Sequence, residues 1–162
     1  MEIFFFIPVI IITFFMIVVF NSIKIVKEYQ RLVVFRLGKH FGVLGPGVVF
    51  VWPVIDQAVW VDLRESTLEF VKVNCMAKDG KEVSFDLSVK FQIIDPVASV
   101  TKVKNIYNDS KNVTEKLLRD FIERYFSQDI PFRKREIGML FKEVLERAVK
   151  DWGVKIISVE LK

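Results

Sequence analysis

The chain begins with an uninterrupted apolar segment, from Ile3 to Phe20, which has no charged side chain in eighteen residues. An α-helix rises 1.5 Å per residue, so this segment would extend about 27 Å, close to the hydrocarbon thickness of a bilayer. Its Phe, Ile and Val side chains would surround the helix, whereas a core helix is apolar on one face. It also lacks the basic start and the small-residue cleavage site of a signal peptide. The sequence therefore predicts a membrane anchor formed by residues 1–23.

Two details refine this anchor. Pro8 suits the start of a spanning helix, but it would also suit the bend of a re-entrant hairpin. A hairpin would need a longer apolar run with its breaker near the middle, so we favour a single span. Basic residues follow the span, beginning with Lys24 and Lys27, and none precedes it. Because Lys and Arg concentrate on the cytoplasmic side of membranes, we expect the rest of the chain in the cytoplasm.

About 140 residues follow the anchor, which is enough for one domain with its own core, here residues 24–162. The net charge of +4 is spread along the chain, so it gives no indication of nucleic-acid binding, for which clustered Lys and Arg would be needed. Cys75 is the only cysteine, so no internal disulfide can form.

Short β-branched and aromatic runs predict strands in the first half of this domain, and Gly, Pro and Asp separate them. They read as one small, mostly antiparallel sheet. The clearest strand runs from Val83 to Ile93, where apolar and polar residues alternate without an error. The turn Lys78-Asp79-Gly80 precedes it, and Asp95-Pro96 ends it and begins a helix. The other predicted strands are Ile25-Val26, Leu32–Phe35, Val48–Trp52 and Val59–Val61.

The apolar period changes from two to 3.6 residues after Pro96, which predicts amphipathic helices. The first helix would bury Val113, Leu117, Leu118, Phe121, Ile122 and Tyr125; the second would bury Ile137, Leu140, Phe141, Val144, Leu145, Ala148 and Trp152. Gly153 suits the end of the second helix, and Val154–Leu161 returns to strand character. This order predicts an α+β domain in which two or three amphipathic helices pack on the sheet.

Seven motifs follow one another along the chain in a definite order and spacing. They are Arg36-Leu37-Gly38-Lys39, Gly45–Asp56, Val61-Asp62-Leu63-Arg64, Lys78-Asp79-Gly80, Asp95-Pro96, Leu118-Arg119 and Asp151-Trp152-Gly153-Val154-Lys155. Together they resemble the SPFH domain of the stomatin/prohibitin/flotillin (band 7) family, and stomatin in particular. The resemblance covers about residues 24–162, with a membrane segment in the family's usual place.

The resemblance implies a membrane-anchored scaffold that forms homo-oligomers, organises membrane microdomains and regulates membrane proteins by binding them. The clients it implies are channels, transporters, a membrane protease or an NfeD-like partner. Members usually continue into a long coiled coil, whereas this chain stops at Lys162. We expect the coiled coil to be absent, and the alternative is that the sequence is a fragment of a longer protein. A dedicated one-to-one regulator or inhibitor of a membrane protease or NfeD-like partner is the alternative hypothesis.

No catalytic, cofactor or metal site is expected from the sequence. His40 is the only histidine, and it sits beside Lys39 in a glycine-flanked segment that reads as a solvated loop. One His and one Cys far apart do not make a common metal site. No glycine-rich phosphate loop follows a strand. Cys75 reads as a small apolar filler near a strand end. We therefore expect a non-enzymatic protein.

Two segments are candidate contact surfaces. Val48, Phe50 and Trp52 lie in a run of five apolar residues, so one face of this strand could enter the membrane interface, with Lys24 and Lys27 nearby. The alternative is a strand buried on both faces. Arg133, Lys134 and Arg135 form a basic cluster at the start of the second helix. Cations are unfavourable there, because the helix dipole places partial positive charge at the N-terminus. We consider this cluster a candidate contact for lipid or a partner, and a solvated surface run is the commoner explanation.

Overall fold

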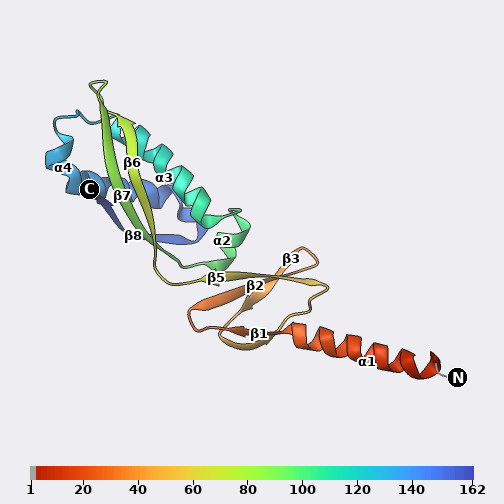
Figure 1. The fold of residues 1–162 in the computed structure, drawn as a ribbon. Helices are drawn as coiled ribbons and strands as arrows, with labels where there is room; N and C mark the ends of the chain where they lie inside the picture. The colour runs from red at the N-terminus through yellow and green to blue at the C-terminus, as the bar shows by residue number, and fades with distance from the viewer. Residues whose placement is uncertain (1–2) are drawn as a thin grey trace. The chain divides into compact units, whose positions relative to one another are not determined.

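A computed structural model describes the backbone of residues 3–162 and the side chains of residues 7 and 9–162. The chain divides into two compact units, residues 1–62 and 63–162, whose elements are drawn in Figure 1. The predicted division into an anchor of residues 1–23 and a domain of residues 24–162 concerns membrane attachment, and these units do not test it.

The described part of the N-terminal unit contains one helix and five strands. The helix α1 (Ile3–Ser22) leads directly into the first strand. The strands form two antiparallel sheets, one of order β1-β4 and one of order β3-β2-β5. Their bounds are β1 (Ile23–Val26), β2 (Gln30–Arg36), β3 (Lys39–Leu44), β4 (Gly47–Phe50) and β5 (Asp56–Asp62).

The apolar N-terminal segment is helical over the 20 residues of α1. Phe20, the last residue of the uncharged apolar run, is 72% exposed. Within the described residues, no helix combines the length and the apolar character that crossing a membrane requires. The predicted span includes Ile3 and Pro8, whose side chains lie outside the described ones.

The core of the N-terminal unit gathers around the middle of β2, where Leu32, Val33 and Val34 are all buried. Val26 from β1 and Val51, just after β4, pack against Leu32 and Val34. The two small sheets therefore share apolar side chains, although no ladder of hydrogen bonds joins them.

The C-terminal unit is a three-stranded antiparallel sheet of order β6-β7-β8 with helices packed on it. The odd-numbered residues of β7 from Phe85 to Ile93 are buried, which confirms the predicted alternation. Helix α3 runs beside β6 (Figure 1), and α4 packs on β8. The bounds are β6 (Ser66–Met76), β7 (Glu82–Ile93), α2 (Pro96–Thr101), α3 (Ile106–Ile122), α4 (Ile130–Ala148), the 3-10 turn η1 (Lys150–Trp152) and β8 (Val154–Leu161).

Local sequence signals account for the helix ends of this unit. Helix α2 begins at Pro96, as predicted, and the Asp95 side chain caps it by accepting hydrogen bonds from the N–H groups of Val97 and Ala98. Asn105 caps α3 in the same way. Gly153 was expected to end the second helix, but α4 ends at Ala148. Gly153 instead adopts the left-handed conformation with φ +69° and ends η1 immediately before β8.

The structure also corrects several expectations. The strands form three small sheets instead of one. Strands β3 and β6 were not predicted, and His40 lies in β3 with an exposed side chain instead of in a loop. In α4, Leu140 and Ala148 were expected on the buried face but are exposed. The basic cluster begins one turn inside α4, because the helix starts at Ile130, and a non-helical residue, Arg133, kinks it there.

Candidate functional site: an apolar surface on the N-terminal unit

The outward side of the β1–β4 ribbon is apolar. The antiparallel register places Ile23 opposite Phe50 and Ile25 opposite Val48, so these four side chains share one side. All four are exposed, by 45% and 72% on β1 and by 73% and 48% for Val48 and Phe50. Trp52 continues the alternation past the end of β4 and is 49% exposed. We call these five residues the apolar face.

The opposite side of the ribbon enters the core. Val26 and Val51 are buried, and the partly buried Val49 packs against the same cluster. The ribbon therefore has one buried side and one exposed side, and the alternative of a strand buried on both faces does not apply to the described chain. On the apolar face, the rings of Phe50 and Trp52 meet edge to face at 5.3 Å between centroids.

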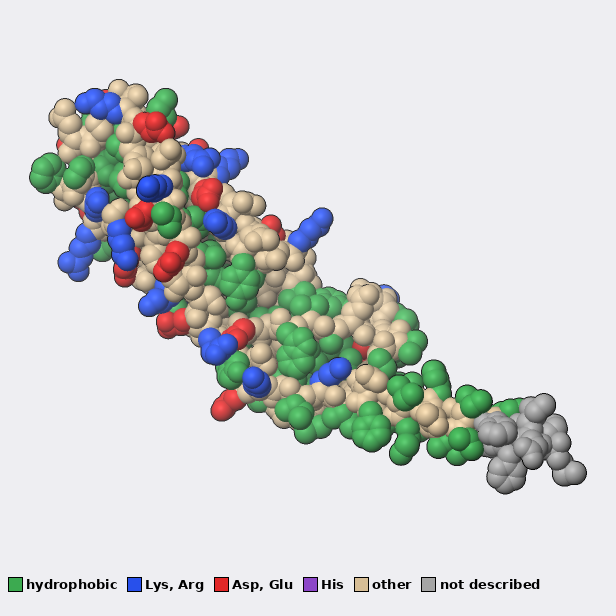
Figure 2. Space-filling view, viewed as in Figure 1, with side chains coloured by type: hydrophobic (Ala, Val, Ile, Leu, Met, Phe, Trp, Pro, Cys, Tyr) green, Lys and Arg blue, Asp and Glu red, His purple; other side chains and the backbone are tan. Residues whose placement is uncertain are grey.

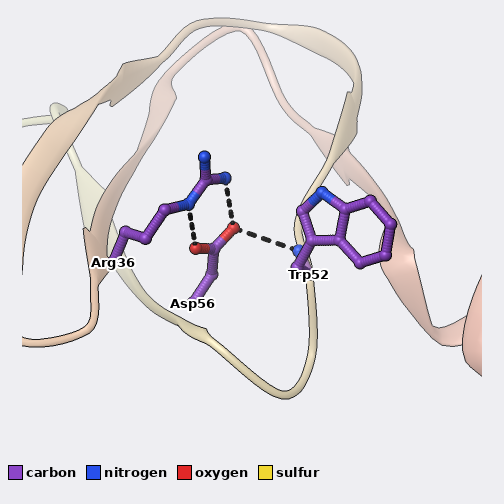
Figure 3. Close-up of polar contacts among 3 residues, drawn as sticks. All are labelled: Arg36, Trp52 and Asp56. Carbon is purple, nitrogen blue, oxygen red and sulfur yellow. Dashed lines mark hydrogen bonds and ion pairs between the residues drawn. The ribbon is translucent and has the colours of Figure 1, made fainter.

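An ion pair holds the loop that carries Trp52. The Arg36 guanidinium donates two hydrogen bonds to Asp56, from Nε to Oδ1 at 2.7 Å and from Nη2 to Oδ2 at 2.9 Å. The Trp52 backbone N–H donates to the same Oδ2 at 3.1 Å, as Figure 3 shows. The Asp56 side chain is 1% exposed, whereas that of Arg36 is 34% exposed. Asp56 thus connects the end of β2 to the loop after β4.

This pair shifts the ionisation of both groups toward the charged forms. The hydrogen bonds from Arg36 lower the pKa of Asp56 below its ordinary value, and the Trp52 N–H adds to this effect. The hydrogen bond to Asp56 raises the pKa of Arg36 in turn. The carboxylate is therefore ionised at neutral pH, and it fixes the loop in one position.

Further apolar side chains lie around this ion pair. Leu37, at the tip of the β2–β3 hairpin, has φ +50° and is 79% exposed. Its N–H donates to the carbonyl of Ile55, which follows the 85%-exposed Val54. Figure 2 shows hydrophobic side chains gathered over the N-terminal unit, while charged side chains are common on the C-terminal unit.

The apolar face connects directly to the end of α1. The Val51 N–H donates to the carbonyl of Ser22, the last residue of α1, at 2.8 Å. Lys24 and Lys27 are exposed at and beyond the same end of the helix. The Nζ of Lys27 lies 5.8 Å from the centre of the Tyr29 ring. Exposed apolar side chains and lysines therefore occur together where the apolar helix ends, an arrangement suited to a membrane interface.

A family model described as "SPFH domain / Band 7 family" matches residues 24–162. The chain belongs to this family. It is 35% identical over 158 residues to a stomatin homolog of Pyrococcus abyssi, which covers 98% of this chain and 59% of the relative. The same values hold for a stomatin homolog of Pyrococcus horikoshii. Stomatin-1 of Caenorhabditis elegans is 37% identical over 145 residues, which cover 89% of this chain and 44% of the relative. The predicted stomatin-like membership is thereby confirmed.

The chain spans less than three fifths of the length of these relatives. The match to the SPFH family begins at Lys24, one residue after β1 begins, so it includes most of the β1–β4 ribbon and all of the C-terminal unit. The family match therefore includes the part of the apolar face contributed by β4 and the loop after it.

The basic cluster of this SPFH domain is partly neutralised. Arg133 donates two hydrogen bonds to Glu136, at 2.9 and 2.7 Å, and these raise its pKa. Lys134 is half-buried and Arg135 is exposed. The neighbouring Phe132 is 91% exposed. As a contact for lipid or a partner, the cluster stays a prediction.

Side chains that could ligate a metal or react are scattered in the described part of the SPFH domain. Among the described residues, no three or more His, Cys, Asp or Glu side chains form a group that could hold a metal. Ser127 Oγ donates to Asp79 at 2.5 Å and lowers the pKa of that carboxyl, a contact that joins the β6–β7 turn to the α3–α4 connection. Cys75 is buried in β6, and its burial raises the pKa of the thiol. Its predicted role as apolar filler fits this position.

Sequence reasoning identified Val48, Phe50 and Trp52 but missed the residues that complete the surface and support it. Ile23 and Ile25 join the apolar face only because β1 pairs with β4. Arg36 and Asp56 are 20 residues apart, and nothing in either local sequence predicts their contact. An arginine and an aspartate near a run of apolar residues and a proline are too common in sequences to predict the Arg36–Asp56 ion pair.

Proposed function

We propose that this SPFH domain is the membrane-attached part of a scaffold that associates with further copies of itself and regulates membrane proteins by binding them. Its apolar N-terminal segment would cross the membrane once, and residues 24–162 would lie on the cytoplasmic side. The observation that carries the proposal is the exposed apolar face at the end of α1, within a chain of the stomatin-related family.

The apolar face supports attachment at the membrane surface. Five large apolar side chains on a two-stranded ribbon would lose water contact if they entered the interfacial region, at a gain of about 25 cal/mol per Å². Trp is favoured at this depth, because its ring is apolar and its N–H remains hydrated. Lys24 and Lys27 would remain among the headgroups, and anionic lipid would favour them.

Binding, and not turnover, is the proposed mechanism. The side chains of the apolar face are hydrocarbon or indole groups, which supply neither a nucleophile nor a general base. An anchor restricts the domain to two dimensions and fixes its height above the membrane. The effective concentration of neighbouring copies therefore rises, and weak lateral contacts become sufficient for assembly.

The mass of the protein complex in native nanodiscs tests this proposal. Light scattering that separates protein from lipid should give a uniform homo-oligomer. A monomer would contradict self-association. A one-to-one complex with a copurifying membrane protein would contradict it too, and would favour the alternative function, a dedicated regulator of one membrane protein.

A further inference from the structure

The edge of the C-terminal sheet has an open stretch beside a helix. Among the described strands, β6 is an outer strand that pairs with β7 alone, so its outer side carries backbone N–H and C=O groups without a strand partner. Helix α3 runs along it: Tyr107 lies 3.3 Å from Ser66 between hydroxyl oxygens, and Lys111 Nζ lies 6.0 Å from the Phe70 ring centre.

Two features limit the open stretch to the second half of β6. A bulge interrupts the β6–β7 register between Phe70 and Val73, where Lys72 has φ +52° and its N–H donates to Asp86 Oδ1 at 2.8 Å. Beyond the strand, the Lys78 N–H donates to the carbonyl of Tyr125 at 2.9 Å, so the α3–α4 connection covers that end. Residues 73–76 remain between them.

A hollow of about 330 Å³ lies along this open stretch. It is lined by Asn74, Cys75 and Met76 of β6, by Glu82 at the start of β7, by Arg119 of α3 and by Glu123 at the C-cap of that helix. Arg119 and Glu123 both act on the thiol of Cys75. They are exposed and stand one helical turn apart, and Arg119 makes a loose contact of 3.8 Å with Glu115.

We infer that residues 74–76 of β6 pair antiparallel with the same residues of a second copy, about a two-fold axis through Cys75 perpendicular to the sheet. Such an axis places Asn74 opposite the partner's Met76 and joins the two sheets edge to edge. It also brings the two α3 helices side by side in opposite directions. Arg119 of each copy then faces Glu123 of the partner subunit, so the charges complement each other twice, as a two-fold interface requires.

The short paired segment predicts a weak contact that depends on membrane confinement. Three residues on each side supply few hydrogen bonds, and the bulge prevents the pairing from extending along β6. This inference rests on the self-association in the proposed function, because a contact of this size needs the raised effective concentration of an anchored chain.

Charge reversal tests the inference. The full chain in lipid vesicles is studied by energy transfer between labelled copies over a series of protein-to-lipid ratios, as wild type, Arg119→Glu, Glu123→Arg and the double variant. Each single reversal places like charges across the axis, so the association constant should fall by about tenfold or more. The double variant restores opposite charges and should regain most of the wild-type association. Glu143→Arg on α4 is the matched control: it also breaks an exposed i,i+4 pair, with Arg147, and should leave association unchanged.

The outcomes separate the two proposals. If wild type is oligomeric and the single reversals associate as well as wild type does, the edge contact is overturned. The proposed scaffold function would then remain supported. A double variant as weak as the single reversals would also overturn it. Monomeric wild type at every protein-to-lipid ratio, with native circular dichroism, would overturn self-association itself.

Discussion

At the scale of single residues, the contact between Arg36 and Asp56 is the one that most shapes the candidate site. The carboxylate is almost wholly removed from water, and three hydrogen bonds from Arg36 and Trp52 satisfy it. Removal of one partner from a buried pair leaves the other uncompensated, which destabilises a fold strongly. The pair therefore determines where the Trp52 loop stands on the N-terminal unit.

We expect Asp56→Asn to loosen this loop. The asparagine keeps the size of the side chain but turns a donor toward Arg36, so the bidentate contact is lost. The melting temperature of the full chain in micelles, followed by circular dichroism, should fall by about 5 °C or more. The control is Glu143→Gln, which removes one charge from the exposed i,i+4 pair with Arg147. This substitution should change the melting temperature little. An unchanged melting temperature for Asp56→Asn would contradict the role of the Arg36–Asp56 ion pair in holding the loop.

The ion pair also predicts that the folding stability of wild type and of Asp56→Asn will depend differently on pH. Because folding lowers the pKa of Asp56, its stabilising contribution is complete above the unfolded pKa, about 3.9, and is lost as the pH falls through the lower folded pKa. Wild type should therefore lose more stability than Asp56→Asn as the pH falls below about 4. Denaturation curves of both proteins from pH 7 to pH 3 measure this, and parallel losses would contradict the assignment.

At the scale of elements, Gly153 joins three segments of the C-terminal unit. Its carbonyl accepts hydrogen bonds from the N–H groups of Ile94 and Asp95, where β7 gives way to α2. A Cβ at this position would lie 2.5 Å from the Asp95 carbonyl oxygen and 2.7 Å from the Asp95 Cβ. The close approach of η1 and β8 to the start of α2 therefore requires a residue without a side chain.

Gly153→Ala should lower the free energy of unfolding by about 3 kcal/mol, from the left-handed backbone and the clash together. Gly38→Ala is the matched control. Gly38 also has positive φ, +80°, but nothing lies within 4 Å of its added Cβ, so only the backbone cost of about 1 kcal/mol applies. Urea denaturation measures both. Equal losses would show that the contact with Asp95 is unimportant.

At the scale of the whole molecule, exposed apolar side chains are concentrated in the N-terminal unit, and the C-terminal unit has a charged surface with isolated apolar residues (Figure 2). A contiguous exposed apolar patch usually marks a contact with protein or membrane. Here it occurs at the end of an apolar helix, which is the arrangement that led us to propose attachment to the membrane.

Spin labels at two equally exposed valines test this attachment. Val48 lies on the apolar face and Val71 on β6, and each is 73% exposed. In nanodiscs, a label at Val48→Cys should be more accessible to apolar oxygen than to a water-soluble nickel complex, whereas Val71→Cys should show the reverse. The native Cys75 is buried and should not react with the label. Aqueous accessibility at both sites would contradict insertion of the apolar face.

The predictable part of the fold is local. The β7 alternation, the Lys78-Asp79-Gly80 turn and the helix start at Pro96 each depend on neighbours within a few residues, so their signals are complete in the sequence. Strand β6 was missed because its bulge at Val71 and Lys72 shifts the side-chain alternation midway. Strand β3 was missed because Gly42 interrupts a short run.

By itself, the sequence determined the apolar N-terminal helix, the α+β order of the elements, the family and three residues of the apolar face. Only the tertiary structure decided that β1 pairs with β4, that Asp56 binds Arg36 and that β6 presents an open edge beside α3. The reason is physical: periodicity and capping act between near neighbours in the chain, whereas strand pairing, bracing ion pairs and sheet edges depend on which distant segments the collapse of the core brings together.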